Sequence, residues 1–156
     1  MSERIEVSRV VPAGAAEVFA VLRDPEGHVA IDASGMLQGS DGRPVEAAGE
    51  SFVVHMDREA LGDLPMGKYD VEVVFTRYEP DTEIAWTIHG TIKPPIGHVF
   101  GYRLEPVAEG TRVVSYYDWS DAAPEWKGIF PVIGESSLKA TLGILDRTVR
   151  RGYPRG

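Results

Sequence analysis

In the stretch FGYRLEPVAEGTRVVSYYDW, residues 100–119, side chains suited to a core alternate with polar side chains. The pattern occurs on both sides of a short connection. Phe100, Tyr102 and Leu104 occupy every other position and therefore share one face of an extended strand. Residues 108–110 are turn-like, which favours antiparallel pairing with the strand that follows. The inward positions of that second strand are Val113, Ser115, Tyr117 and Trp119. The stretch predicts a β-hairpin with an aromatic inner face.

Two earlier segments show the same period of two. Glu72 stands between apolar neighbours, which marks its own face as the outer one. The inward sets are Val71, Val73 and Phe75 in the first segment, and Ile84, Trp86 and Ile88 in the second. Residues 79–81 join the two segments through a short turn, so these strands are also antiparallel neighbours. A meander of antiparallel strands is expected.

Helical spacing appears near the start and at the end of the sequence. Apolar side chains three and four residues apart predict one short helix with the stripe Ala15, Val18, Phe19 and Leu22. Asp24 and Pro25 suit the first positions of a second short helix, which is expected to reach about Ile31. A long final helix has the stripe Leu138, Leu142, Leu145 and Val149, with Glu135–Lys139 and Asp146–Arg150 pairs on its polar side.

The order of these elements predicts an α+β fold. A first strand from Ile5 to Val11 ends at Pro12, because proline lacks the amide that a strand ladder needs. Two short helices, the antiparallel strands and the long helix follow, while residues 34–49 are expected to be loop with at most a brief strand. A curved sheet of this kind wraps the final helix and leaves space for a small apolar molecule between them.

Composition limits the classes of partner. A length of 156 residues predicts a single domain over residues 1–156. The net charge of −8 opposes nucleic acid and anionic membrane surfaces. There is no cysteine, so disulfides and thiolate metal sites are excluded. The charged start and the lack of a long apolar stretch predict a cytoplasmic protein with no membrane span.

Two groups of residues resemble the START-like superfamily of polyketide cyclase/dehydrase and lipid-transport proteins. The first group is Ile5-Glu6-Val7, Val11-Pro12-Ala13, Glu17-Val18-Phe19 and Leu22-Arg23-Asp24. The second is Tyr102-Arg103-Leu104-Glu105-Pro106 with Gly110-Thr111-Arg112-Val113, which looks like the sixth and seventh strands of that family. The resemblance implies a helix-grip fold, in which a seven-stranded sheet curls around the C-terminal helix. It also implies a cavity that takes lipids, polyketides or plant hormones in different members, and it says little about activity.

The inward side chains are the candidates for lining such a cavity. Pockets are mostly apolar with a few polar groups, and these side chains match that composition. The predicted ligand-binding residues are Val71, Val73, Phe75, Trp86, Phe100, Tyr102, Tyr117, Trp119, Trp126, Phe130 and Leu142. Aromatic side chains at alternate strand positions are more often plain core, so packing alone is the competing interpretation.

One loop is unusually apolar. Its apolar members, within residues 122–134, are Trp126, Ile129, Phe130, Pro131 and Val132. This composition favours either a flap over the cavity mouth or a loop packed on the body or against another subunit. Residues 58–67 and 91–97, rich in Gly and Pro, are candidates for the same rim. Gly143 in the final helix indicates a close approach of backbone or ligand.

No motif assigns a catalytic mechanism. The sequence lacks a phosphate-binding glycine loop, a serine-hydrolase elbow and a tight zinc spacing, so no cofactor and no metal are expected. An acid–base pair would have to come from His55, His89, Tyr102, Tyr117 or Asp118, and none of these forms a convincing pair. We favour binding or transport of a small hydrophobic or aromatic ligand. A polyketide cyclase or dehydratase, a domain that contacts another protein through residues 122–134, and a homodimer stay open.

Overall fold

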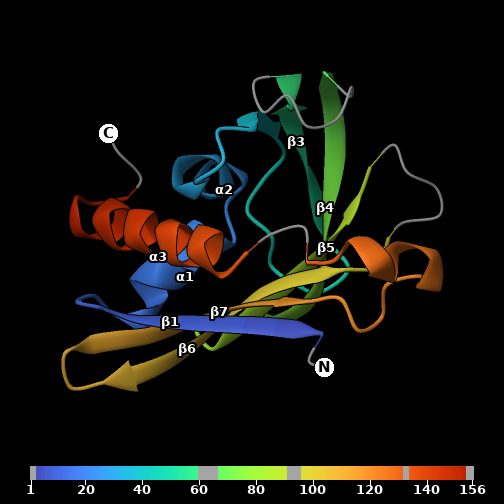
Figure 1. Ribbon diagram of the computed structural model, residues 1–156. Coiled ribbons are helices and arrows are strands. Elements are labelled where there is room, and N and C mark those ends of the chain that lie inside the picture. The colour runs from blue at the N-terminus through green and yellow to red at the C-terminus, as the bar shows by residue number, and fades with distance from the viewer. Residues whose placement is uncertain (1–2, 60–66, 91–95, 132–133, 154–156) are drawn as a thin grey trace.

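The computed structural model describes residues 3–59, 67–90, 96–131 and 134–153. Within them, antiparallel strands form a seven-stranded sheet in the order β1-β7-β6-β5-β4-β3-β2. The strands are β1 (Arg4–Val11), β2 (Leu37–Asp41), β3 (Ser51–Asp57), β4 (Lys68–Glu79), β5 (Glu83–His89), β6 (Val99–Val107) and β7 (Gly110–Asp118). The helices are α1 (Ala15–Leu22), α2 (Pro25–Ile31) and α3 (Glu135–Arg150), with the 3-10 helix η2 (Pro124–Ile129) before α3. The sheet curls around α1, α2 and α3 (Figure 1), which confirms the predicted helix-grip α+β class.

The start of α2 is built as the sequence predicts. The Asp24 carboxylate accepts a hydrogen bond from the Glu26 amide at 3.0 Å, and Pro25 takes the first helical position. The other carboxylate oxygen of Asp24 accepts from the Tyr153 hydroxyl at 2.8 Å. The segment after α3 is therefore fastened to the start of α2.

The apolar stripe of α3 faces the core, and Leu138, Leu142, Leu145 and Val149 are all buried. Asp146 was expected on the polar side, but it is only 5% exposed. Its carboxylate accepts from Arg9 Nε in β1 at 2.7 Å and from Arg150 Nε at 2.6 Å. These charge-assisted hydrogen bonds join α3 to the first strand of the sheet.

Gly143 does not lie against another backbone. The nearest atom to a Cβ built on Gly143 is in the Arg9 guanidinium, 3.8 Å away, which is ordinary van der Waals contact. The close backbone approach that the sequence indicated at this position is therefore absent among the described residues, and the approach of a ligand there stays a prediction.

An irregularity in β4 resets which side chains face the core. Phe75 pairs with Trp86, but the next paired residue is Arg77, opposite Ala85. This bulge places Tyr78 on the inner face, where its ring meets Phe19 of α1 edge-on at 5.3 Å. Strict alternation from Phe75 would have turned Arg77 toward the core instead.

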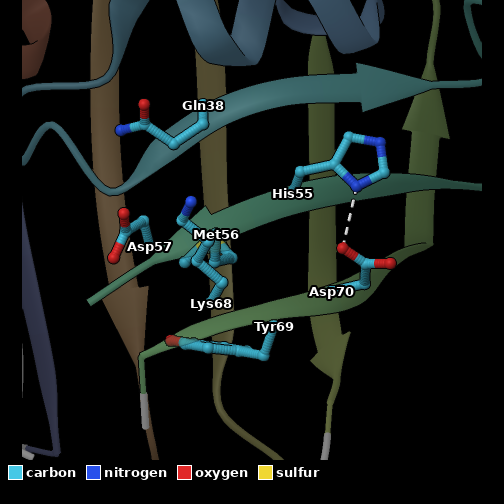
Figure 2. Close-up of a pocket in the computed structure, with 7 residues that line it drawn as sticks. All are labelled: Gln38, His55, Met56, Asp57, Lys68, Tyr69 and Asp70. Carbon is cyan, nitrogen blue, oxygen red and sulfur yellow. Dashed lines mark hydrogen bonds and ion pairs between the residues drawn. The ribbon is translucent and has the colours of Figure 1, made fainter. Parts of the chain in front are cut away.

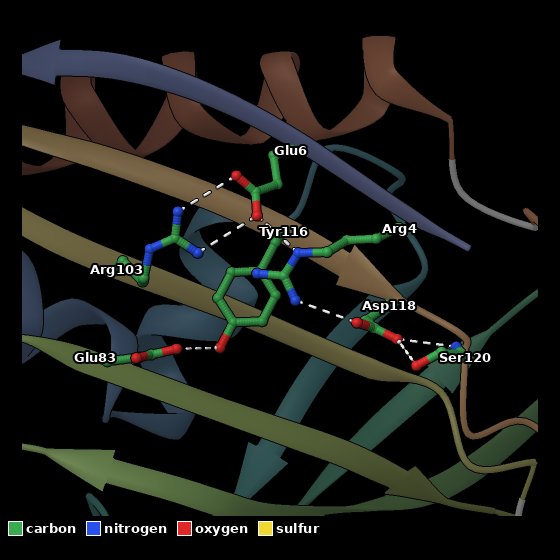
Figure 3. A network of polar contacts seen from close by, with 7 residues as sticks. All are labelled: Arg4, Glu6, Glu83, Arg103, Tyr116, Asp118 and Ser120. Atoms are coloured by element: carbon green, nitrogen blue, oxygen red, sulfur yellow. Dashed lines mark hydrogen bonds and ion pairs between the residues drawn. The ribbon is translucent and has the colours of Figure 1, made fainter. Parts of the chain in front are cut away.

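Tyr116 is a buried aromatic side chain on the outer face of the sheet (Figure 3). Its register partner is Gly101 in β6, and the ring occupies the space that a side chain at Gly101 would need. The Tyr116 hydroxyl donates to Glu83 in β5 at 2.6 Å. The ring thus covers a strand glycine and joins β7 to β5 across β6.

Two arginines cover the Tyr116 ring. The Arg4 and Arg103 guanidinium carbons lie 4.1 and 5.6 Å from its centroid. Glu6 accepts from both arginines, and these hydrogen bonds lower the pKa of Glu6. Arg4 also donates to Asp118 at 3.1 Å. The outer face of β1, β6 and β7 is held together by this network.

Candidate functional site

Aromatic rings on the inner face contact one another from β3 to the end of η2. Their order across the sheet is Phe52, Phe75, Trp86, Phe100, Tyr102, Tyr117, Trp119 and Phe130. Contacting ring centroids along this order lie 4.5 to 6.3 Å apart, the range of favourable aromatic pairs. We call this set the aromatic row. It spans β3 to β7 and presents one continuous apolar surface to the interior.

The aromatic row is closed at one end and accessible at the other. At the β3 end, Phe52 and Phe75 are 3% and 1% exposed. At the other end, Phe100 and Phe130 are only half-buried. Ile96, just before β6, is half-buried as well. The open end therefore lies beside the start of β6 and the residue that follows η2.

His28 of α2 covers the closed end of the row. Its ring centroid lies 4.5 Å from that of Trp86 and 5.0 Å from that of Phe52. Its Nε2–H donates to the Leu22 carbonyl at 2.8 Å. Burial lowers the pKa of His28 to about 4, so the side chain is neutral at neutral pH.

His98 stands at the open end of the row. Its Nδ1 and the Tyr117 hydroxyl are 2.7 Å apart, and its ring meets Phe100, Tyr117 and Phe130 edge-on at 5.3 to 5.7 Å. The His98 carbonyl accepts from Thr87 Oγ1 at 2.6 Å, which holds this backbone against β5. Burial lowers the pKa of His98 to about 4 and raises that of Tyr117, so both groups are neutral at neutral pH.

The centre of the row is uncharged as well. Burial raises the pKa of Tyr102 to about 12, and a hydrogen bond with Ser115 partly offsets that effect. Ser115 is 2% exposed and lies on the strand directly opposite Tyr102. The arrangement offers apolar surface and neutral hydrogen-bonding groups, which suits a hydrophobic molecule better than a charged one.

Ten of the eleven predicted ligand residues lie at or beside the row. Seven are its members: Phe75, Trp86, Phe100, Tyr102, Tyr117, Trp119 and Phe130. Val71 and Val73 are buried beside them on β4, and Leu142 of α3 is buried in the same core cluster. Trp126 differs, because it is half-buried on η2 and makes no ring contact among the described residues. That these residues bind a ligand stays a prediction.

Sequence reasoning did not place His28, His98 or Phe52 in the site. The period-two alternation of β6, extended one step back from Phe100, would have turned His98 inward. His28 lies three residues before Ile31, which would have placed both on the core face of α2. The signals were therefore present, at the ends of elements where boundaries are least certain.

The apolar loop before α3 is fastened to the body. The Ala123 amide donates to the Ile96 carbonyl at 3.1 Å, and Lys127 Nζ donates to Glu3 and to the Ser120 carbonyl. Phe130, at the end of η2, stacks on Trp119. Val132 and most of the predicted rim segments 58–67 and 91–97 lie outside the described residues. Whether the loop is a flap or an interface stays open.

A separate groove of about 500 Å³ runs along β2, β3 and β4 (Figure 2). It is lined by Gln38, His55, Met56, Asp57, Lys68, Tyr69 and Asp70, none of which belongs to the aromatic row. His55 contacts Asp70 Oδ1 at 2.8 Å and Asp41 Oδ2 at 2.7 Å, and these carboxylates raise its pKa. No group of three or more potential metal ligands gathers among the described residues. The groove is open and of mixed charge, so it does not resemble a hydrophobic ligand site.

Residues 2–150 match the family described as polyketide cyclase / dehydrase and lipid transport. The chain belongs to this family. The match covers the sheet and α3, so it agrees with the START-like resemblance that the sequence motifs suggested.

One relative and two solved structures are similar to this chain. An uncharacterised protein of Mycobacterium tuberculosis is 28% identical over 158 residues, and the match covers 96% of the chain but only 65% of that relative. A Chromobacterium violaceum crystal structure has a TM-score of 0.71 at 16% identity, with 94% of this chain and 97% of that chain covered. The Aha1 dimer from Colwellia psychrerythraea has a TM-score of 0.62 at 14% identity, with 96% and 98% covered. These two structural likenesses show the fold alone.

Among the described residues, no helix combines the length and the apolar character that a membrane crossing requires.

Proposed function

We propose that the protein binds a small hydrophobic molecule with aromatic character against the aromatic row, as a cytoplasmic carrier or sensor. The observation that carries this proposal is the half-buried end of the row at Phe100 and Phe130. Apolar ring surface that the chain leaves uncovered gains about 25 cal/mol per Å² when a ligand covers it. The family description, which names lipid transport, supports the same class of ligand.

The chemistry of the row supports this class. Flat rings stack or meet edge-on with other rings at the centroid distances found along the row, so a planar ligand extends the same packing. The titratable groups beside the rings are neutral, and they therefore add no charge that a hydrophobic ligand would leave unpaired.

Binding is tested with the neutral fluorescent probe N-phenylnaphthylamine and with a matched pair of variants. Phe100→Ala removes a ring at the open end of the row. Tyr78→Ala removes a half-buried ring near the end of β4, which packs against Phe19 of α1 and is not a member of the row. Phe100→Ala is expected to weaken probe binding about tenfold. The lost ring no longer buries apolar surface against the probe, which removes roughly 1.4 kcal/mol of binding free energy. Tyr78→Ala is expected to bind as the wild type does.

Equal weakening in both variants, or no saturable binding by the wild type, contradicts the proposal. Native mass spectrometry of freshly purified protein gives an independent measurement. A retained hydrophobic small molecule supports binding, and an apo mass with a co-purified protein favours the interaction role instead.

A cyclase or dehydratase is the second candidate, favoured by the hydrogen-bonded His98–Tyr117 pair beside the row. A general base works best when its pKa is near the working pH, and the pKa of His98 at about 4 makes it a weak base. Turnover of a linear polyketone by the purified protein would favour this candidate over simple binding.

Protein contact is the third candidate. Trp126 is a half-buried indole on η2 outside the aromatic row, and such side chains often anchor interfaces. The Colwellia protein of the same fold is described as a dimer, so we include a homodimer in this candidate.

A further inference from the structure

We propose that His98 selects, among hydrophobic ligands, uncharged aromatic molecules that carry a carbonyl oxygen, and discriminates against carboxylates of the same shape. This inference rests on the proposed function and names the ligand class of the same site. It depends on three features of the described residues at the open end: the proton on Nε2 of His98, the lack of an acceptor for that proton, and the lack of a positive charge beside the rings.

The position of the proton follows from Tyr117. Its side chain is fully buried, and its hydroxyl has His98 Nδ1 as its hydrogen-bond partner among the described residues, at 2.7 Å. A buried phenol needs an acceptor for its proton, so the Tyr117 O–H donates and Nδ1 accepts. A neutral imidazole that accepts at Nδ1 carries its proton on Nε2. Tyr117 therefore fixes His98 as a donor through Nε2.

The Nε2–H of His98 has no acceptor among the described residues. The imidazole is half-buried and has Phe100 and Phe130 at 5.3 and 5.7 Å, so its neighbours at the open end are rings without acceptor atoms. A ligand that lies on these rings and carries a carbonyl oxygen supplies the missing acceptor. A purely hydrocarbon ligand leaves the N–H without a partner and loses that contribution.

Among the described residues, a carboxylate finds no positive partner beside the row. His28 and His98 are neutral, and Tyr102 and Tyr117 are protonated phenols. The cation–π contacts of the described residues involve Arg4 and Arg103 on the outer face, at Tyr116. A buried anion without a paired cation is strongly unfavourable, whereas a carbonyl group needs one donor. The row therefore discriminates by charge as well as by shape.

Three naphthalenes with the substituent at the same ring position separate these effects. Isothermal titration calorimetry at about pH 7.5 compares naphthyl methyl ketone, ethylnaphthalene and naphthoate. The ketone is expected to bind about three- to tenfold more tightly than ethylnaphthalene, which is the range of one net hydrogen bond. Naphthoate is expected to bind at least about tenfold more weakly than the ketone.

His98→Phe tests the donor, and His55→Phe, in the separate groove, is its matched control. His98→Phe is expected to abolish the preference for the ketone over ethylnaphthalene, while His55→Phe keeps it. His98→Phe also leaves the Tyr117 hydroxyl without its partner. The double variant His98→Phe/Tyr117→Phe removes that hydroxyl and is expected to show the same loss of preference.

The outcomes distinguish the two proposals. If all three ligands bind with equal affinity, or His98→Phe keeps the ketone preference, the inference on His98 is overturned and ligand binding stands. If none of the three binds the wild type, both are overturned. The inference is supported if the wild type prefers the ketone and both His98 variants lose that preference.

Discussion

The histidines show how burial sets the behaviour of single residues. His28 and His98 lie among rings without a negative partner, and burial lowers the pKa of each to about 4. His55 is an exposed residue between two carboxylates, and these raise its pKa. The same side chain is therefore neutral beside the aromatic row and favoured as a cation in the groove.

His28 predicts a loss of stability in mild acid. Its pKa is near 6.5 in the unfolded chain and about 4 in the folded one, so the unfolded state binds the extra proton first. Its stabilising contribution is complete above pH 6.5, declines as the pH falls and is lost near pH 4. Within that window His28 contributes a slope of about 1.4 kcal/mol per pH unit.

Urea unfolding at several pH values between 4 and 7 measures this slope. His28→Gln removes the titrating group and keeps an amide that can donate to the Leu22 carbonyl. This variant is expected to show a shallower dependence of unfolding free energy on pH. The dependence does not vanish, because His98 and the carboxylates still titrate. An unchanged slope would show that His28 does not carry the effect.

At the level of the strands, β6 and β7 are held on their outer face by the Tyr116 ring. A Cβ at Gly101 would lie within 2.6 Å of three atoms of the Tyr116 side chain, so Gly101→Ala must displace the ring. Displacement breaks the Tyr116–Glu83 hydrogen bond and the contact with Arg4, and we expect a loss of about 1–3 kcal/mol in unfolding free energy.

A double-mutant cycle with Tyr116→Ala checks this cause. In the Tyr116→Ala background the ring is absent, so Gly101→Ala is expected to cost less than about 0.5 kcal/mol. If Gly101→Ala costs the same in both backgrounds, the ring is not what excludes a side chain at Gly101.

The elements were predictable where local patterns determine them. Strand parity and the Asp24–Pro25 start of α2 depend on adjacent residues, and both are confirmed. The bulge after Phe75 and the burial of Tyr116 depend on partners from distant segments, so no local pattern indicated them. The site was predictable to the same extent, since parity placed its rings inward. His98 was missed because it lies one residue before β6, where the boundary of a strand is hard to predict from sequence.

Across the whole molecule, α3 is fixed to the sheet mainly through β1. The Arg9–Asp146 contact joins residues 137 positions apart, and hydrogen bonds from Arg9 and Arg150 lower the pKa of Asp146 even though its burial opposes this shift. The aromatic row crosses the inner face of the same sheet from β3 to β7, the strand that pairs with β1. The fold thus anchors its helix at the β1 edge of the sheet.

Asp146→Asn is expected to loosen this anchor. It keeps the shape of the side chain but leaves two arginines without their carboxylate, at an expected cost of about 1–3 kcal/mol in unfolding free energy. Glu135→Gln, in an exposed pair on the same helix, is the control and is expected to cost under about 0.5 kcal/mol. Equal effects of the two variants by urea unfolding would contradict the anchoring role.

The pairing of β1 with β7 has a consequence for biosynthesis. Arg4 lies opposite Asp118, so β1 leaves the ribosome well before the strand with which it pairs, β7. Such distant pairing slows folding and leaves sheet edges unprotected in the meantime. A nascent chain halted before residue 110 therefore lacks the partner of β1, and we expect it to expose the strand edge that β7 covers in the folded protein.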